Sequence, residues 1–348
     1  MKLHSLTITP QILSTIAEID EFRGGWNTMH DLTPERLKEL RHVATIESIG
    51  SSTRIEGAKM TDSEIEQMIG ELGKESFKTR DEQEVAGYAE AMEVIFQNFD
   101  EIPITENYIK QLHSMLLKYS EKDIRHRGQY KTLSNSVEAF DREGKSLGVV
   151  FGTATPFDTP RLMEELIKWI VGTLEDKAYH PLIAIGVFNV VFLAIHPFQD
   201  GNGRLSRVLA TLLLLKANYR YVPYTSLESI IEKSKDSYYL ALRRTQGTLD
   251  DEQPKWEPWL AFFLNALNKQ KNHLVAKMES NNGWDGLPLK SIKILEYLNK
   301  HDRITRKVAE EIMTIPRTTL TLRFNELVEQ GLIVRYGKAR ATWYGLKK

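Results

Sequence analysis

Two apolar helical patterns on either side of one short polar loop constrain the fold of this chain more than any other feature. The loop is HPFQDGNG, residues 196–203. Apolar residues recur around it at the spacings of a helix face, namely Phe188, Val191, Phe192 and Ile195 before the loop and Leu205, Val208, Leu209, Leu212 and Leu213 after it. We therefore expect two buried helices, separated at Pro197 and joined by this loop.

Most of the remaining chain before about residue 275 also has the helical period. Residues 128–157 are the exception, because they are rich in Thr, Val, Ser and Gly around a turn-like DREGK. This composition predicts a β-hairpin or an extended flap. The expected fold class is therefore mainly α, a helical bundle with a small β-hairpin flap.

Charge is distributed unevenly along the 348 residues. Residues 290–348 contain 13 Lys and Arg against 6 Asp and Glu, a net charge of +7, which leaves 33 against 41, or −8, for residues 1–289. A chain of this length has room for two or three domains. The Asn, Gly and Pro residues near 276–288 predict a linker between an acidic body and a basic C-terminal unit.

The basic unit, residues 289–348, predicts three short helices at 289–300, 305–313 and 317–330, followed by a hairpin. Pro316 would precede the third helix, where proline is favoured. This order resembles a winged helix-turn-helix, which makes Arg317, Thr319 and Arg323 candidate DNA contacts. A winged helix used for dimerisation or target docking is the alternative, because fold does not fix function.

Two negative features of the sequence exclude several classes of protein. The chain has no cysteine, which excludes disulfides, thiolate metal sites and cysteine nucleophiles. It also has neither a signal-like N-terminus nor an apolar run of about 18 residues. We therefore expect a cytoplasmic protein with no membrane partner.

The polar loop contains the parts of a phosphate-transfer site. Gly201 and Gly203 let backbone N–H groups converge at a helix N-terminus, which is a ready anion site. Arg204 and Arg207 follow in the first turn, where each costs about a few tenths of a kcal/mol unless an anion is present. This arrangement favours an oligophosphate ligand over a solvated basic helix start.

Two other side chains of the loop have chemistry suited to that ligand. Asp200 is a hard oxygen ligand for Mg²⁺ bridging phosphates. His196, with a reference pKa of about 6.5, can accept a proton from an attacking hydroxyl. Phe198 is expected to be a buried anchor of the loop. The spacing lacks the Lys-Ser/Thr of a P-loop and the third glycine of a dinucleotide fingerprint, and Arg204 stands where a calcium loop needs a ligand.

The loop and the first helical turn resemble the signature of the Fic family, HxFx(D/E)GNGRxxR, at every fixed position. The resemblance covers roughly residues 45–270 and includes SKDSYYLALR at 234–243. It implies transfer of AMP from ATP to a Tyr, Thr or Ser hydroxyl of a target protein, with release of pyrophosphate. His196 would be the base, Asp200 the Mg²⁺ ligand, and Arg207 the residue that takes the γ-phosphate. The other implied ATP-binding residues are Gly201, Asn202, Gly203, Arg204, Leu205, Ser206 and Tyr239.

A second short motif resembles the inhibitory pattern of the same family, (S/T)xxxE(G/N). It consists of Ser52, Glu56 and Gly57 in a helix at about 45–60. The Glu56 carboxylate would pair with Arg207 and compete with the γ-phosphate. The resemblance also implies that a flap at about Lys131 to Val137 docks the target by backbone pairing.

The sequence therefore predicts a Fic-type protein adenylyltransferase with an N-terminal helical region (1–100), a catalytic core (101–275), a linker (276–288) and a winged helix-turn-helix (289–348). Expected partners are ATP, a target protein, a second copy of the chain and, through the winged helix, DNA. The alternatives are a nucleotide-sensing transcription regulator, removal of AMP from a modified target, and transfer of another nucleotide or of a phosphoryl group.

Overall fold

The structure is a computed structural model that describes residues 2–28, 32–70, 77–140, 146–279, 287–313, 317–337 and 342–347. The α-helices are α1 (Pro10–Thr28), α2 (Pro34–Ile55), α3 (Asp62–Gly70), α4 (Arg80–Asn98), α5 (Glu106–Leu116), α6 (Thr159–Glu175), α7 (Pro181–Ile195), α8 (Asn202–Lys216), α9 (Leu227–Lys233), α10 (Lys235–Gln246), α11 (Glu257–Glu279), α12 (Leu289–Lys300), α13 (Arg306–Met313) and α14 (Arg317–Glu329). The strands are β1 (Ser136–Phe140), β2 (Ser146–Gly152), β3 (Ile333–Tyr336) and β4 (Trp343–Leu346), and short 3₁₀ turns occupy Leu3–Ser5, Glu121–Asp123 and Val222–Tyr224. The predicted mainly α fold with a small antiparallel hairpin is confirmed.

The chain divides into two compact units. The larger contains residues 1–29 and 40–276, and the smaller contains residues 30–39 and 277–348. The predicted N-terminal region and catalytic core thus lie in one unit, apart from residues 30–39. Helix α2 runs through the boundary at residues 39 and 40, so its last turn belongs to the larger unit.

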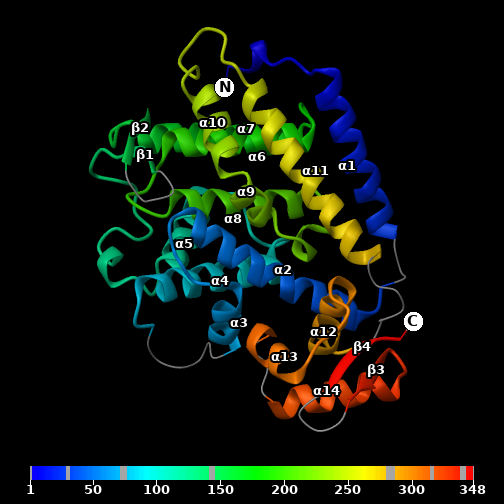
Figure 1. The fold of residues 1–348 in the computed structure, drawn as a ribbon. Coiled ribbons are helices and arrows are strands. Elements are labelled where there is room, and N and C mark those ends of the chain that lie inside the picture. The colour runs from blue at the N-terminus through cyan, green and yellow to red at the C-terminus, as the bar shows by residue number, and fades with distance from the viewer. Residues whose placement is uncertain are drawn as a thin grey trace. The chain divides into compact units, whose positions relative to one another are not determined.

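Helix α7 forms the centre of the larger unit. It is apolar on all sides and almost wholly buried, as expected of a helix without a solvent face. Helices α6 and α8 pack against it, and α4 and α5 pack against α8 (Figure 1). The first turn of α8, with its two arginines, is therefore buried within the larger unit.

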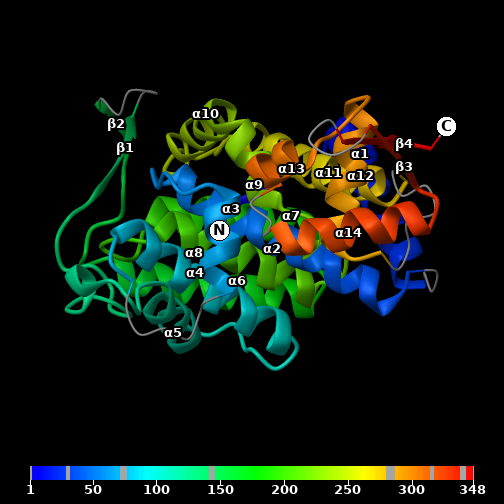
Figure 2. The same cartoon turned by 60° about the horizontal axis from the view of Figure 1, so that its bottom comes forward.

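The predicted flap is a two-stranded antiparallel hairpin in which Ser136 pairs with Gly152 and Phe140 with Ser146. Figure 2 shows the β1–β2 hairpin standing out from the helical body of the unit. Residues 131–135, where the flap was expected to begin, are irregular and lead into β1.

The smaller unit contains α12, α13 and α14, with β3 and β4 paired antiparallel and Ile304 bridged to Tyr344. Leu320, Phe324 and Leu327 of α14 are buried in its core, and the Phe324 ring stacks on Tyr344 at 4.2 Å. The helices occupy the predicted ranges within one residue, whereas Pro316 lies outside the described residues. The assignment as a winged helix stays a prediction.

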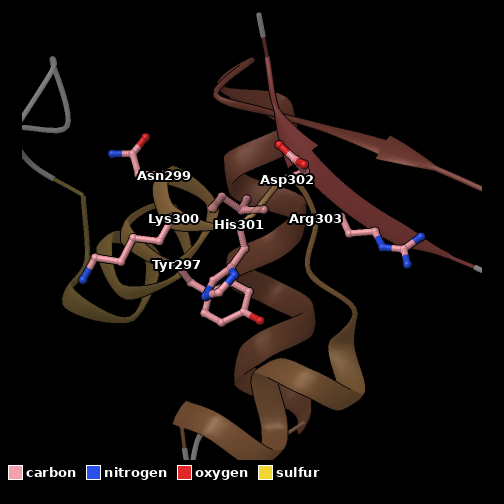
Figure 3. A pocket seen from close by; sticks show the side chains of 7 residues that line it. Tyr297, Asn299, Lys300, His301, Asp302 and Arg303 are labelled. Carbon is pink, nitrogen blue, oxygen red and sulfur yellow. The ribbon is translucent and has the colours of Figure 1, made fainter.

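A hollow of about 480 Å³ at the end of α12 is lined by residues 297–303. Figure 3 shows Lys300 and Arg303 pointing in opposite directions, away from the overlapping rings of Tyr297 and His301. The basic groups do not converge, so this hollow has no anion site. Among the described residues, no helix combines the length and the apolar composition that crossing a membrane requires.

Candidate active site

The loop between α7 and α8 is held in shape by its own amide and aromatic side chains. Phe198 is fully buried, as expected of an anchor. The Asn202 side chain donates to the Phe198 carbonyl at 2.7 Å and accepts from the Phe198 N–H at 2.9 Å. Gly201 has φ +78°, a backbone conformation that residues other than glycine rarely adopt. Asn202 therefore uses its side chain to close the loop, while its backbone N–H belongs to the free N-terminus of α8.

His196 ends α7 with φ +52°, in the left-handed region. Its Nδ1 lies 3.2 Å from the Leu193 carbonyl, which can only accept, so Nδ1 carries the proton. Nε2 is then the nitrogen that can accept one. Burial lowers the pKa of His196 to about 4, and the nearby charge of Lys131 acts in the same direction. The ring is neutral at pH 7, which is the form a general base requires.

Arg207 is 3% exposed and is bound by the C-terminal end of α2 and the turn that follows it. Its Nε donates to Ser52 Oγ at 2.9 Å, and its Nη2 donates to the Ser52 carbonyl at 2.9 Å and to Glu56 Oε1 at 2.8 Å. Burial opposes the charge on Arg207, but the Glu56 carboxylate raises its pKa overall. The structure thus brings the two predicted motifs together, although Glu56 and Arg207 are 151 positions apart in sequence.

The Glu56 carboxylate also lies directly over the N-terminal turn of α8. A Cβ added to Gly203 would lie only 2.2 Å from Glu56 Oε1, so the absence of a side chain at 203 is what permits this approach. A helix N-terminus favours negative charge. Glu56 therefore occupies an anion position formed by α8 and Arg207. The helix predicted at about 45–60 begins earlier, at Pro34, and ends at Ile55, which places Glu56 and Gly57 in the turn that follows.

Arg204, the other arginine of this turn, is 2% exposed and points toward a different carboxylate. Its Nη1 lies 3.2 Å from Glu84 Oε2 on α4, and Glu84 also pairs with Arg80 at 2.7 Å. Glu84 was not predictable as a site residue from the sequence, because a lone glutamate on a helix has no distinguishing pattern. Its burial beside Arg204 identifies it as the counter-charge for that arginine.

Asp200 is about a third exposed and is surrounded by cations, with Arg80 at 3.4 Å, Arg204 at 3.5 Å and Lys122 at 3.6 Å. Although burial opposes ionisation, these charges and the Gly201 N–H hold its pKa below the usual value. No group of three or more His, Cys, Asp or Glu side chains suited to a metal occurs among the described residues. A single ionised carboxylate still fits Mg²⁺ that is held mainly by phosphate oxygens.

The last turn of α2 is held in place by Arg54. Its guanidinium pairs with Glu232 of α9 at 2.7 Å and with Asp62 of α3 at 2.9 Å, and donates to the Met60 carbonyl at 3.0 Å. Because Arg54 lies between Ser52 and Glu56 in sequence, these contacts fix the segment that binds Arg207.

Lys131, at the base of the flap, is 3% exposed and makes three hydrogen bonds. Its Nζ donates to Asn135 Oδ1, Thr153 Oγ1 and the Ile195 carbonyl at 2.8 to 3.0 Å. Its backbone N–H donates to the Pro197 carbonyl at 2.9 Å. Burial lowers the pKa of Lys131 to about 8. The flap base and the His196 segment are therefore joined through one side chain, a role that sequence spacing did not indicate.

The other predicted ATP-binding residues lie around the same turn. Leu205 is fully buried in the core, and Ser206 Oγ donates within the helix to the Gly203 carbonyl at 2.8 Å. Tyr239 of α10 is partly buried, and burial together with the Glu56 charge raises its pKa. The Leu205 and Ser206 side chains thus serve the fold of α8, whereas Tyr239 lies on the side of Glu56.

The candidate DNA contacts lie on α14 in the smaller unit. Arg317 is exposed and Thr319 is half-buried. Arg323 pairs with Glu326 at 2.6 Å, and the apolar Leu322 beside it is 51% exposed. The surface around these candidate contacts is therefore partly neutralised and partly apolar.

Comparison with known proteins agrees with this geometry. Residues 103–214 match the Fic/DOC family. "Protein adenylyltransferase Fic" of Drosophila grimshawi is 26% identical over 238 residues, which are 66% of this chain and 45% of that protein. This chain thus spans less than half the length of that relative.

The similarity to solved structures extends over more of the chain than the similarity to the Drosophila protein. The crystal structure of a Fic family protein from Desulfovibrio desulfuricans G20 covers 98% of this chain and 97% of its own, with 25% identity and a TM-score of 0.61. A Fic domain containing signaling protein from Bacteroides thetaiotaomicron shares the fold over 77% of this chain and 98% of its own, with 21% identity and a TM-score of 0.59. The family match begins after Glu56 and ends before residue 277, so it includes neither part of the smaller unit.

Proposed function

Because residues 103–214 of this chain are a Fic domain, we propose that the protein is an adenylyltransferase that transfers AMP from ATP to a hydroxyl side chain of a protein. One observation carries the proposal. A proton-accepting Nε2 of His196, the Asp200 carboxylate and the N-terminus of α8 belong to a single loop and helix turn. These are the parts that attack on a phosphorus atom requires, since positioning and charge neutralisation supply most of its catalysis.

The placement of these groups supports the following reaction. The hydroxyl oxygen of the target attacks the α-phosphorus of ATP, and its proton passes to His196 Nε2. The bond between the α-phosphorus and the oxygen that bridges to the β-phosphate breaks, and pyrophosphate leaves. The N–H groups of Asn202 and Gly203 at the N-terminus of α8 donate to the phosphate oxygens, and the Arg204 guanidinium offsets their charge, while the Gly201 N–H remains bonded to Asp200 Oδ1.

Two further charges act on this site. The negative charge of a bound triphosphate raises the low pKa of His196 and thereby makes it a stronger base. Asp200 would hold Mg²⁺, which supplies charge neutralisation at the phosphate oxygens when it is bound.

Autoinhibition by Glu56 is the second part of the proposal. Glu56 Oε1 lies 2.8 Å from Arg207 Nη2, the group assigned to the γ-phosphate. A carboxylate and a phosphate cannot occupy one anion position, because like charges in a partly buried site repel strongly. ATP therefore enters productively only when Glu56 withdraws. Support comes from the contact geometry, since Ser52 and Glu56 lie outside the family match.

The identity of the transferred group is the decisive test. The protein is incubated with ATP labelled at the α- or the γ-phosphate, using Glu56→Gly and the double variant that also carries His196→Ala. Label on protein from α-labelled ATP alone, abolished in the double variant, is expected. Label from γ-labelled ATP overturns AMP transfer in favour of phosphoryl transfer. ATP binding without any label transfer favours the nucleotide-sensing regulator.

The same assay examines three remaining expectations. Labelling of the enzyme itself would support auto-modification, and a rate that rises with protein concentration would mean that one copy modifies another, whereas the mass of the labelled protein in solution tests the homodimer. Release of AMP from the labelled protein by wild type would support the reverse reaction.

A further inference from the structure

We infer that His113, on α5, is a positioning residue. It fixes the peptide plane between Asp200 and Gly201 and thereby orients the Asp200 carboxylate and the start of α8 in the anion-binding loop. The inference rests on the proposed function and adds a residue outside the signature motif. Its imidazole is fully buried and contacts the loop on an edge and on a face.

The hydrogen bonds of His113 define its tautomer. The Gly128 N–H donates to Nδ1 at 2.8 Å, so Nδ1 carries no proton. Nε2 lies 2.9 Å from the Asp200 carbonyl oxygen, which can only accept, so Nε2 carries the proton. The ring is therefore neutral with both nitrogens engaged. This pattern excludes a role for His113 as a base or as a direct ligand of the nucleotide.

The planarity of the peptide bond transmits this contact to the functional groups. The Asp200 carbonyl and the Gly201 N–H belong to one rigid peptide unit, so fixing the oxygen also fixes the direction of the N–H. That N–H donates to Asp200 Oδ1 at 2.6 Å. One imidazole hydrogen bond thus orients both the Asp200 carboxylate and the point where α8 begins.

The bonds between Asn202 and Phe198 do not fix the peptide between Asp200 and Gly201, where Gly201 adopts φ +78° and glycine imposes little conformational preference. The hydrogen bond from His113 to Asp200 restrains this peptide, and a second contact of His113 restrains the loop further. The His113 ring stacks on Phe198 at 3.8 Å with an interplanar angle of 13°. Since Gly128 immediately precedes the segment that leads into the flap, His113 joins three parts of the site: α5, the entry to the flap, and the loop.

Three substitutions at His113 distinguish the effect of each hydrogen bond from the effect of ring packing. In His113→Asn, the amide oxygen reaches the place of Nδ1 and keeps the bond from Gly128, but the bond to Asp200 is lost. In His113→Gln, the amide nitrogen reaches the place of Nε2 and keeps the bond to Asp200. In His113→Phe, the ring and its stacking remain while both bonds are lost.

The experiment uses the full chain in the Glu56→Gly background and measures three quantities. These are kcat and KM for ATP in AMP transfer, the dissociation constant of ATP with and without Mg²⁺ by calorimetry, and the melting temperature. We expect His113→Asn and His113→Phe to lose about 10- to 100-fold in kcat/KM and in affinity for ATP with Mg²⁺. His113→Gln should stay within about threefold of its parent in both.

Equal ATP affinity in all four proteins overturns the inference. So does a loss that follows the melting temperature and is the same for Asn and Gln, because that result means packing alone. If the Glu56→Gly parent transfers no AMP, the proposed function fails, and the ATP affinities still decide whether His113 aims the loop.

Discussion

The Glu56 carboxylate and the Arg207 guanidinium form a 2.8 Å hydrogen-bonded ion pair in which the arginine is almost fully buried and the glutamate is about a third exposed. The asymmetry matters, because Arg207 is also held by Ser52 and stays in place when Glu56 leaves. Under the proposed mechanism we therefore expect Glu56, the more exposed partner, to be the one that withdraws, which leaves Arg207 available to a phosphate.

Neutralising Glu56 should release part of the proposed inhibition. Glu56→Gln keeps the size and one weaker hydrogen bond to Arg207 but removes the charge. We expect rates of AMP transfer to rise in the order wild type, Glu56→Gln, Glu56→Gly, because charge-assisted hydrogen bonds are roughly twice as strong as neutral ones. Rates are measured with α-labelled ATP. Glu56→Gln as active as Glu56→Gly would mean that charge alone inhibits, and Glu56→Gln as silent as wild type would mean that bulk alone does.

Breaking the restraint on α2 should activate the enzyme indirectly. Arg54→Ala removes the pairs with Glu232 and Asp62, which lowers the free energy of unfolding by about 1 kcal/mol and loosens the turn that carries Glu56. We expect a several-fold rise in AMP transfer.

Arg161→Ala is the matched control, since Arg161 also pairs with two carboxylates but on the exposed surface of α6. The control should leave the rate unchanged. A rise of equal size in both variants, or in neither, would contradict a role for Arg54 in holding Glu56.

The left-handed backbone conformation of His196 predicts that the side chain required for activity lowers the stability of the folded protein. With φ +52°, any residue that carries a Cβ is strained there, and glycine is not. His196→Gly should therefore be more stable than His196→Ala by about 1 kcal/mol, while both lack AMP transfer. Thermal unfolding compares the two variants under identical conditions. An equally stable or less stable glycine variant would show that this backbone is unstrained.

The buried neutral imidazole of His113 predicts acid sensitivity. Burial lowers its pKa to about 4 in the folded chain, against about 6.5 when unfolded. A lowered folded pKa means that the contribution is present above pH 6.5 and is lost as the pH falls toward 4. Linkage gives a loss of about 2 kcal/mol between pH 7 and pH 5. Urea unfolding at both pH values should show a smaller pH effect for His113→Phe than for wild type, whereas an identical effect would contradict the assignment.

Much of this arrangement was predictable from the sequence, for a physical reason. The apolar spacing around residues 196–203 determines two buried helices and hence a loop with its anion-binding end in the core. The helices of the smaller unit were predicted within one residue, because their apolar positions are regular and turn residues separate them.

The partners of the site residues were not predictable in the same way. These partners are single polar residues on helices or in irregular segments, namely Glu84, Lys131, His113 and Arg54. Only tertiary packing brings them to the site residues or to the segments that carry those residues, so no spacing marks them. Asn202 shows the converse, because the sequence motif assigns it to ATP while its side chain closes the loop onto Phe198.

The most direct measurement is the ratio of initial rates of AMP transfer for Glu56→Gly and wild type, with α-labelled ATP and Mg²⁺ in excess. A hydrogen bond to a charged group contributes about 1.5 to 3 kcal/mol, so removing the competitor should raise the rate about 10- to 100-fold. A ratio near one, with both proteins active, would contradict the account that Glu56 controls this site.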